Sequence, residues 1–202
     1  MRLPAAPANM PAKSCQGSRP AKTIRAYGAS PSLGNLASLT QLCLSYNQLS
    51  GAIPPELGNL SSLAILVLHG NQLSGSIPPA FGNLTSLQAL TLNENLLSGA
   101  IPTELGNLSN LRTLHLSRNQ LAGDVPASFV NLVNLSDPSI YGDFSNGLDL
   151  DYNALTVPEG YPDLTNPLHV LLSQKDPEWH LLQAFEQVIG SAGGSLTSLD
   201  GS

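Results

Sequence analysis

The chain has 202 residues, of which 42% are hydrophobic but only 5% aromatic and 11% charged, so its core is expected to consist of many small aliphatic contacts. The formal net charge of −6 is unevenly distributed, because five of the eight basic residues lie within the first 25 positions and all 14 acidic residues lie from Glu56 onward. This acidic body disfavours nucleic-acid binding, and no apolar run approaches the 18 residues that a membrane span needs.

Residues 1–27 are expected to form a disordered basic leader. They contain no apolar stretch of the kind that a secretory signal requires. The chain has two cysteines, Cys15 in this leader and Cys43 beyond it. Two cysteines do not form a disulfide framework, and they do not decide between an oxidising and a reducing compartment.

From residue 28 to about residue 157 the sequence repeats every 24 residues. The repeated positions hold asparagine, proline, glycine and leucine, and the asparagine column is Asn47, Asn71, Asn95 and Asn119. The next asparagine, Asn153, follows after one period plus a ten-residue insertion. A fixed period of this length predicts a solenoid, in which one coil cannot bury its leucines alone and the next coil covers them.

Each repeat is expected to contain a strand, a bend and a turn. Leu66 and Leu68 flank Val67 in the alternation that is typical of a strand with one buried face. The glycine–proline segment is expected to turn the chain back, because it cannot continue a ladder or a long helix. The asparagine lies at the bend, where its amide can bond backbone groups, so replacing Asn95 by Leu should cost about 1–3 kcal/mol.

The repeated pattern LxxLxLxxNxLxGxIPxxLGNL resembles the leucine-rich repeat, in particular the plant-type 24-residue form. The resemblance implies an α/β repeat solenoid that is right-handed, with a parallel β-sheet on its concave face and GxIP segments and short helical turns on the other side. It also implies a non-enzymatic scaffold that binds a protein or peptide at the cell surface or outside the cell. It implies no cofactor.

The ends of the repeat region depart from the pattern. The segment GASPSLGNL, Gly28–Leu36, resembles the second half of a repeat, and nothing before it resembles the family's cysteine-paired cap. We therefore expect either a poorly covered first coil that could mediate self-association or, preferably, a fragment of a longer solenoid. The insertion SDPSIYGDFSNG, residues 136–147, interrupts the fifth coil and is expected to form a loop at the edge of the concave face.

Residues 158–190 are expected to cap the last coil, partly as helix. In NPLHVLLSQ, Asn166 can cap a helix that starts at Pro167, with Leu168, Leu171 and Leu172 on one face. A second helix is expected from Asp176–Pro177, with apolar contacts from Trp179, Leu182 and Phe185. The segment LSQKDPEW resembles the closing part of bacterial leucine-rich repeat proteins, and residues 191–202 are expected to be a flexible tail or the start of a truncated module.

The variable strand positions of the concave face form the candidate ligand site, since leucine-rich repeats usually bind there. Most of the charge in these positions lies in the C-terminal coils. The predicted patch consists of Glu94, His115, Arg118, Asp149, Asp151 and Tyr152. The alternative is an ordinary solvated strand face without a partner, because exposed polar residues need no special explanation.

Metal and catalytic sites are not expected. His69 and His115 lie two coils apart, which is ~10 Å or more at the usual strand spacing, so they cannot share a zinc ion alone. The segment DLDYN begins like a calcium loop, but Ala154 stands where the loop needs glycine and Gly160 where it needs glutamate. A weak cation site at Asp149 and Asp151 and a solvated acidic rim remain alternatives. No phosphate loop, nucleophile elbow or metalloprotease helix occurs, so no enzymatic activity is predicted.

Four asparagines fit the N-glycosylation sequon: Asn59, Asn83, Asn107 and Asn134. Three of them belong to the GNLS/T segment of the repeated pattern. All four could be glycosylated only in a eukaryotic secretory pathway. A second class of function, a structural or ice-binding solenoid, also stays open, because some plant leucine-rich repeat proteins resemble one. The irregular, charged concave positions count against it, and the more regular NLS/T rows count in its favour.

Overall fold

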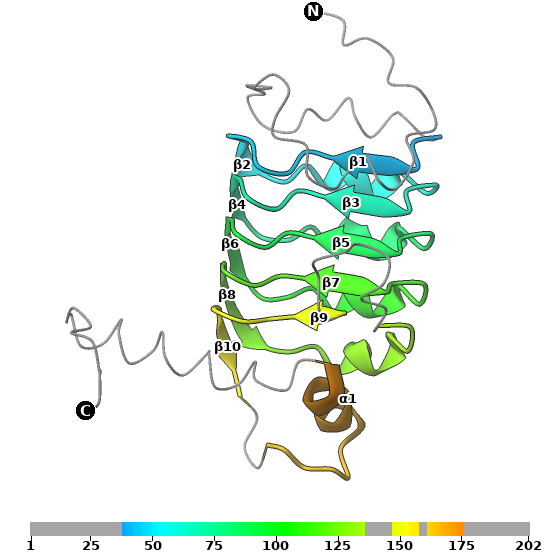
Figure 1. The fold of residues 1–202 in the computed structure, drawn as a ribbon, viewed down its shortest axis with the longest axis vertical. Coiled ribbons are helices and arrows are strands. Elements are labelled where there is room, and N and C mark those ends of the chain that lie inside the picture. The colour runs from blue at the N-terminus through cyan, green and yellow to red at the C-terminus, as the bar shows by residue number, and fades with distance from the viewer. Residues whose placement is uncertain (1–37, 136–146, 158–160, 176–202) are drawn as a thin grey trace, which may run out of the picture.

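A computed structural model describes residues 38–135, 147–157 and 161–175, which form five stacked coils and one α-helix (Figure 1). Several predicted segments lie outside the described residues. These are the leader, the half repeat Gly28–Leu36, nearly all of the insertion, the second C-terminal helix and the tail.

One side of the stack is a five-stranded parallel sheet. Its strands are β1 (Gln41–Cys43), β3 (Ile65–Val67), β5 (Ala89–Thr91), β7 (Thr113–His115) and β9 (Leu148–Asp149), in the order β1-β3-β5-β7-β9. Residues one period apart are paired, as in Leu66↔Leu90, and Leu114 pairs with Leu148 across the insertion. The predicted parallel sheet and its register are therefore confirmed.

A second parallel sheet lies along the neighbouring side of the stack. It consists of β2 (Ser50–Ala52), β4 (Gln72–Gly75), β6 (Leu96–Gly99), β8 (Gln120–Asp124) and β10 (Ala154–Thr156), in the order β10-β8-β6-β4-β2. The expectation that the glycine–proline segment cannot continue a ladder was wrong for its glycine half. Gly51 pairs with Leu73 at a φ of +84°, because stacked coils place the same irregular backbone above itself, and the strand ends before the proline.

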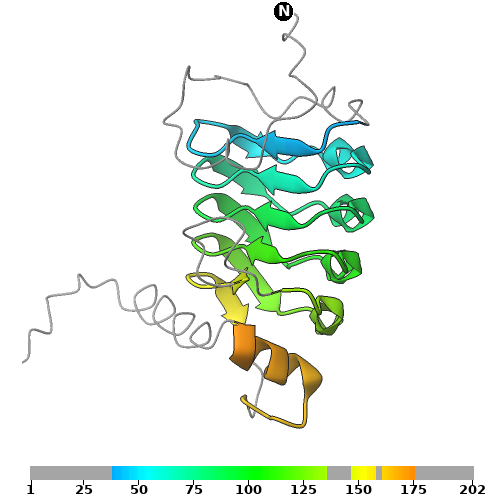
Figure 2. The same ribbon diagram turned by 45° about the vertical axis from the view of Figure 1, so that its right-hand side comes forward.

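The third side of the stack is a column of 3₁₀ helices, as expected from the short helical turns (Figure 2). These are η3 (Pro55–Asn59), η4 (Pro79–Asn83), η5 (Thr103–Asn107) and η6 (Ala127–Asn131). A glycine in each of the first three helices faces the backbone of the next coil. A Cβ atom at Gly82 would lie 2.6 Å from the carbonyl oxygen of Glu104. In η6 the same place holds Val130, and η6 packs against η5 and also against the α-helix.

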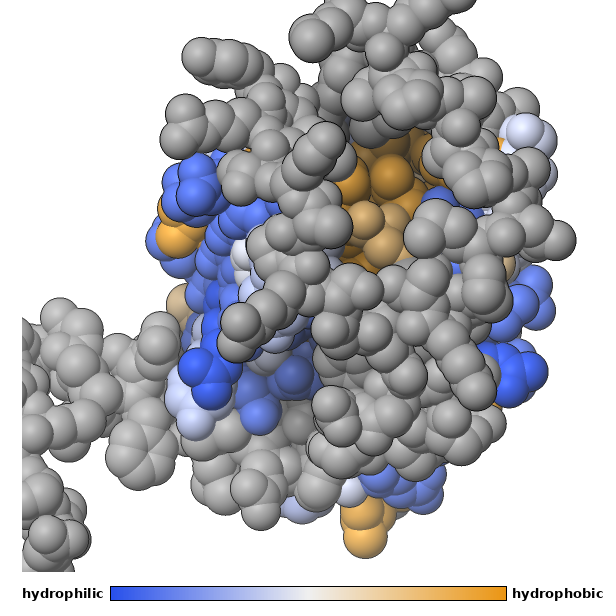
Figure 3. Space-filling view, turned by 45° about the horizontal axis from the view of Figure 1, so that its top comes forward, coloured by the Kyte–Doolittle hydropathy of each residue, from blue (hydrophilic) through white to orange (hydrophobic). Residues whose placement is uncertain are grey.

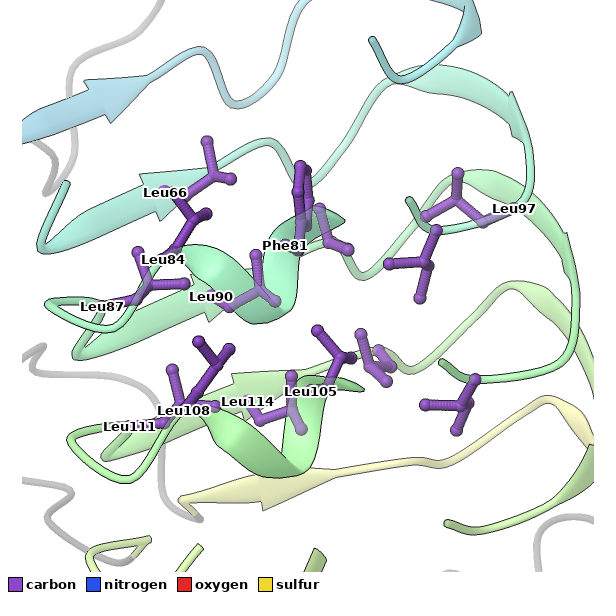
Figure 4. Close-up of a cluster of buried hydrophobic side chains, with 14 of the residues drawn as sticks. Leu66, Phe81, Leu84, Leu87, Leu90, Leu97, Leu105, Leu108, Leu111 and Leu114 are labelled. Atoms are coloured by element: carbon purple, nitrogen blue, oxygen red, sulfur yellow. The ribbon is translucent and has the colours of Figure 1, made fainter. Parts of the chain in front are cut away.

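The core is a continuous column of leucines enclosed by the two sheets and the 3₁₀ helices. Leu66, Leu90 and Leu114 point inward from successive strands toward the helices, and each is fully buried (Figure 4). Phe81 fills the same space from η4. Each coil thus covers the leucines of its neighbour, which is the physical reason for the repeat.

The first coil is covered less completely than the others. Its leucines Leu39, Leu42 and Leu44 are only partly buried, whereas their counterparts in later coils are fully buried. Figure 3 views this end of the stack obliquely and shows hydrophobic residues near the centre of the described surface. This agrees with the expectation of a poorly covered first coil, while self-association remains a prediction.

The helix α1 (Pro167–Lys175) begins where the sequence predicts it. The side-chain oxygen of Asn166 accepts a hydrogen bond from the backbone N–H of Leu168 at 2.9 Å, and Leu168 and Leu172 join the leucine core. The helix therefore covers the C-terminal end of the stack. Within the described ranges, no helix has both the length and the apolar character to cross a bilayer.

Candidate functional site

The concave face is defined here by the side chains of the first sheet that point away from the leucine core, together with the residues at the strand ends. An asparagine in each coil fixes these strand ends. The Asn95 side-chain oxygen accepts a bond from the Leu73 N–H at 3.0 Å, and its amide donates to the carbonyls of Leu68 and Leu92 at 3.2 and 3.0 Å. The predicted role of this asparagine column is confirmed.

The residue before each asparagine adopts a left-handed backbone conformation and lies at the rim of the concave face. The φ angles at Glu94, Arg118 and Tyr152 are 57°, 53° and 51°, and Tyr46 and Gly70 occupy the same place in the first two coils. The tight bend imposes this conformation. Half of the predicted patch thus lies on one rim.

The polar end of the concave face is formed by β7, β9 and the bends that follow them. The Ser117 hydroxyl donates a 2.6 Å hydrogen bond to the Asp149 carboxylate. His115 is the strand partner of Asp149. The Arg118 guanidinium lies 4.9 Å from the centre of the Tyr152 ring, a cation–π contact.

Five of the six predicted residues therefore lie at this end of the sheet, whereas Glu94 follows the middle strand β5. Glu94 and Arg118 are exposed and Asp149, Asp151 and Tyr152 are half-buried, but His115 is only 3% exposed. His115 is therefore not part of a solvated surface, while the alternative of a face without a partner stays open. Sequence reasoning also missed Ser117, because a serine in a serine-rich repeat carries no distinctive signal.

The apolar end of the concave face lies on β3 and β5. Ile65, Val67 and Ala89 form a hydrophobic cluster separate from the leucine core and are 5%, 7% and 1% exposed. β3 was expected to be buried only on the side that faces the leucine core. This expectation was wrong, because Val67 on the concave side is buried as well. The polar residues Thr91, Thr113 and His115 at the equivalent positions are equally buried, at 2–3% exposure, so the burial does not depend on residue type.

A cluster around His69 lies beside the apolar strands, in the first three coils. The His69 ring nitrogen Nδ1 lies 3.1 Å from the Thr91 hydroxyl, and the Tyr46 ring meets His69 edge to face at 4.8 Å. The Tyr46 ring lies over Gly70, where a Cβ atom would be 2.6 Å from it. Burial lowers the pKa of His69, and His115 lowers it further, although the charge of Glu94 raises it. Gly70, the glycine among the residues that precede the asparagines, was the one sequence signal for this cluster.

Two side-chain amide oxygens on the concave face lack a hydrogen-bond partner within the described part of the chain. These are Gln41 Oε1 and Asn93 Oδ1, and both atoms are buried. Buried acceptors are normally satisfied, so each suits an N–H donor. Cys43, on β1 beside Gln41, is disulfide-bonded.

No group of three metal-ligating side chains occurs among residues 38–135, 147–157 and 161–175. Asp149 instead accepts bonds from Ser117 and, at 3.3 Å, from the backbone N–H of Asp151. The weak cation site at Asp149 and Asp151 therefore stays a prediction, because the acidic residues of the insertion lie outside the described residues.

Comparison with protein-family models identifies leucine-rich repeats in this chain. One model, described as "Leucine rich repeat", matches residues 61–121, and another, described as "Leucine Rich Repeat", matches residues 38–60. A search of curated protein sequences finds no match.

Among solved structures, the chain is similar to the ectodomain of the plant membrane receptor kinase GASSHO1/SCHENGEN3 from Arabidopsis thaliana. The identity is 41%, the TM-score is 0.59, and the match covers 65% of this chain and 15% of that one. The Arabidopsis receptor kinase HAESA ectodomain matches at 33% identity and TM-score 0.53, over 64% of this chain and 24% of that one. A plant ice-binding protein matches at 39% identity and TM-score 0.51, over 54% and 36%.

The chain thus spans less than half the length of each of these three proteins. The likeness lies in the stacked coils and their parallel sheets. Together with the 24-residue period, the asparagine column and the 3₁₀ helices, it shows that the chain belongs to the leucine-rich repeat proteins of the plant type.

Proposed function

We propose that the chain is a non-enzymatic scaffold that binds an extended peptide along its concave face, as part of an extracellular recognition protein. The observation that carries the proposal is the change of polarity along that face. Ile65, Val67 and Ala89 form its apolar end, and Asp149 and Asp151 belong to its acidic end. A ligand lying across the coils would need apolar groups opposite the apolar residues and basic groups opposite the acidic residues.

The apolar end suits aliphatic side chains of a peptide. Because Ile65, Val67 and Ala89 are already 1–7% exposed, the gain would come mainly from the peptide's own apolar surface, at roughly 25 cal/mol per Å² removed from water. Gln41 Oε1 and Asn93 Oδ1 lie on the same face and are acceptors. Backbone N–H groups of an extended peptide are the donors that such acceptors would bind.

The acidic end suits a lysine or arginine side chain. Glu94, Asp149 and Asp151 supply three carboxylates, whereas Arg118 and Arg112 are the arginines beside β7. Asp149 is already oriented by Ser117, so it offers a fixed acceptor. A fixed carboxylate favours charge-assisted hydrogen bonds, which are about twice as strong as neutral ones.

The size of the face favours a peptide over a globular partner. Five short strands at ~4.8 Å spacing give a projected sheet of about 300 Å². A standard protein–protein interface buries about 800 Å² on each partner. The HAESA ectodomain was solved in complex with an N-terminal extended IDA peptide hormone ligand, and GASSHO1/SCHENGEN3 in complex with CASPARIAN STRIP INTEGRITY FACTOR 2.

An extracellular location is supported by two observations. The similar receptor kinases are represented by their ectodomains. Cys43 is disulfide-bonded, and disulfides persist mainly in oxidising compartments.

The test is a binding titration with designed peptides. A fluorescent ten-residue peptide with aliphatic residues in one half and lysines in the other is compared with the inverted sequence, by fluorescence anisotropy on the unmodified full chain. One orientation should bind at least tenfold more tightly. Equal affinity of both peptides, or no binding of either, would refute the proposal.

Matched variants locate the site. The double substitution Asp149→Asn with Asp151→Asn should weaken binding of the favoured peptide at least tenfold. Asp124→Asn, an exposed position on β8 of the second sheet, should change it less than twofold. Equal losses in both variants would mean that net charge, and not this face, causes binding.

An ice-binding function is the second candidate, because a plant ice-binding protein is among the similar structures. Ser61, Thr85 and Ser109 form a regular, exposed hydroxyl row next to the 3₁₀ helices. An ice-recrystallisation assay separates the two candidates. Inhibition that is lost when these three residues are changed to lysine would favour this alternative.

A further inference from the structure

The convex side of the stack carries a row of identical asparagines. Asn59, Asn83 and Asn107 are the last residues of η3, η4 and η5, and all three are exposed. Their positions differ by one repeat, so they lie one above another along the column of 3₁₀ helices (Figure 2). Each is followed by a buried leucine and then by an exposed serine or threonine.

The local backbone is the same at all three places. The N–H groups of Ser61, Thr85 and Ser109 donate to the carbonyl oxygens of the asparagines two residues earlier, each at 2.9 Å. This tight turn directs the leucine into the core, where it is fully buried, and leaves the asparagine and the hydroxyl residue on the outside. The Asn-X-Ser/Thr sequence thus coincides with an outward-facing acceptor amide.

We propose that Asn59, Asn83 and Asn107 are N-glycosylation sites and that this row of glycans covers the convex side of the stack. The inference rests on the extracellular location proposed above. The donor is a lipid-linked oligosaccharide diphosphate. A bond forms between the asparagine Nδ2 and C1 of the first sugar, the bond from C1 to the diphosphate oxygen breaks, the lipid diphosphate leaves, and the transferase takes one amide proton.

The fourth sequon, at Asn134, occupies a different structural position. Its amide nitrogen donates a 2.8 Å bond to the Ser109 carbonyl of the preceding coil, as Asn110 does one coil earlier to Thr85 at 2.9 Å. A glycan on Asn134 would compete with this contact between coils.

The structural equivalent of the row in η6 is Asn131, which is exposed and ends its helix. It lacks a sequon because Val133 stands where the hydroxyl residue should be. Val133 is 74% exposed, so its replacement disturbs no core contact. The substitution Val133→Thr should create a fourth glycosylation site in the row, whereas Val133→Ala should not.

The experiment secretes the full chain, behind an added signal sequence, from a eukaryotic host. Enzymatic deglycosylation in ¹⁸O-labelled water followed by peptide mass spectrometry then measures occupancy at each asparagine. Occupancy above one half at Asn59, Asn83 and Asn107, and a new site at Asn131 in Val133→Thr only, would support the proposal. An unoccupied row in the secreted protein, or no new site at Asn131 in Val133→Thr, would overturn it.

The outcome is independent of the peptide-binding test, which uses unmodified protein. A bare row with intact peptide binding would refute only the glycan proposal. A glycosylated row without peptide binding would refute only the proposed ligand.

Discussion

Replacing Asn95 by alanine tests the bend that positions the concave face. The Asn95 side chain is 6% exposed and connects its own coil to the preceding one. Removing it breaks the bond from the Leu73 N–H and the bonds to the carbonyls of Leu68 and Leu92. The free energy lost depends on which of these groups find another partner.

The carbonyl groups keep a partner after the substitution. Leu68 also accepts a bond from Asn71 at 2.9 Å, and Leu92 accepts one from Asn119 at 3.1 Å. The Leu73 N–H is the group that loses its acceptor, and one unsatisfied buried donor costs about 1–3 kcal/mol. We expect Asn95→Ala to lower the free energy of unfolding by about 2–3 kcal/mol, including the weaker carbonyl bonds.

Asn47 provides the matched control because it occupies the same place in the first coil. It is half-buried and donates to the carbonyls of Leu44 and Ser45 at 3.1 and 3.0 Å. In the part of the chain that the structure describes, no backbone N–H donates to its side-chain oxygen. Asn47→Ala should therefore cost about 1 kcal/mol or less. Urea unfolding followed by far-UV circular dichroism measures both, and equal losses would refute the reasoning.

Two further predictions concern packing and pH. Gly82→Ala should lower the free energy of unfolding in urea by about 1–3 kcal/mol, because its Cβ atom would meet the Glu104 backbone. Val130→Ala, at the end of the glycine column, should lower it less. A larger loss in Val130→Ala than in Gly82→Ala would contradict this account of the packing. Because burial lowers the pKa of His69 below its usual 6.5, the unfolded chain binds a proton that the folded chain does not, and stability should fall as pH falls from about 6.5 toward the folded pKa. This slope, at most about 1.4 kcal/mol per pH unit, should disappear in His69→Gln, and an unchanged slope would exclude His69 as its cause.

The sequence predicts the elements whose period and residue types are unambiguous. The strand register, the asparagine bend and helix α1 with its Asn166 cap follow from spacing and from elementary hydrogen-bonding chemistry. The second sheet was missed because glycine and serine have low strand propensity, and only the stacking of identical coils turns such residues into a ladder.

The candidate site was predictable only in part. The charged residues of β7, β9 and their bends could be located, because the repeat fixes which positions face outward. The contact of Tyr46 with His69 could not, since it depends on the absence of a side chain at Gly70 in the next coil. The buried state of His115 depends on its surroundings and not on its place in the repeat.

The glycine column of the 3₁₀ helices has a mechanical consequence. A solenoid curves when its coils are spaced more widely on one side than on the other. Here hydrogen-bonded ladders hold two sides near the usual ~4.8 Å strand spacing, and the glycines let the third side approach to backbone contact. Figure 1 shows the strands of the first sheet one above another along the stack, so a ligand laid across them can touch every coil in turn.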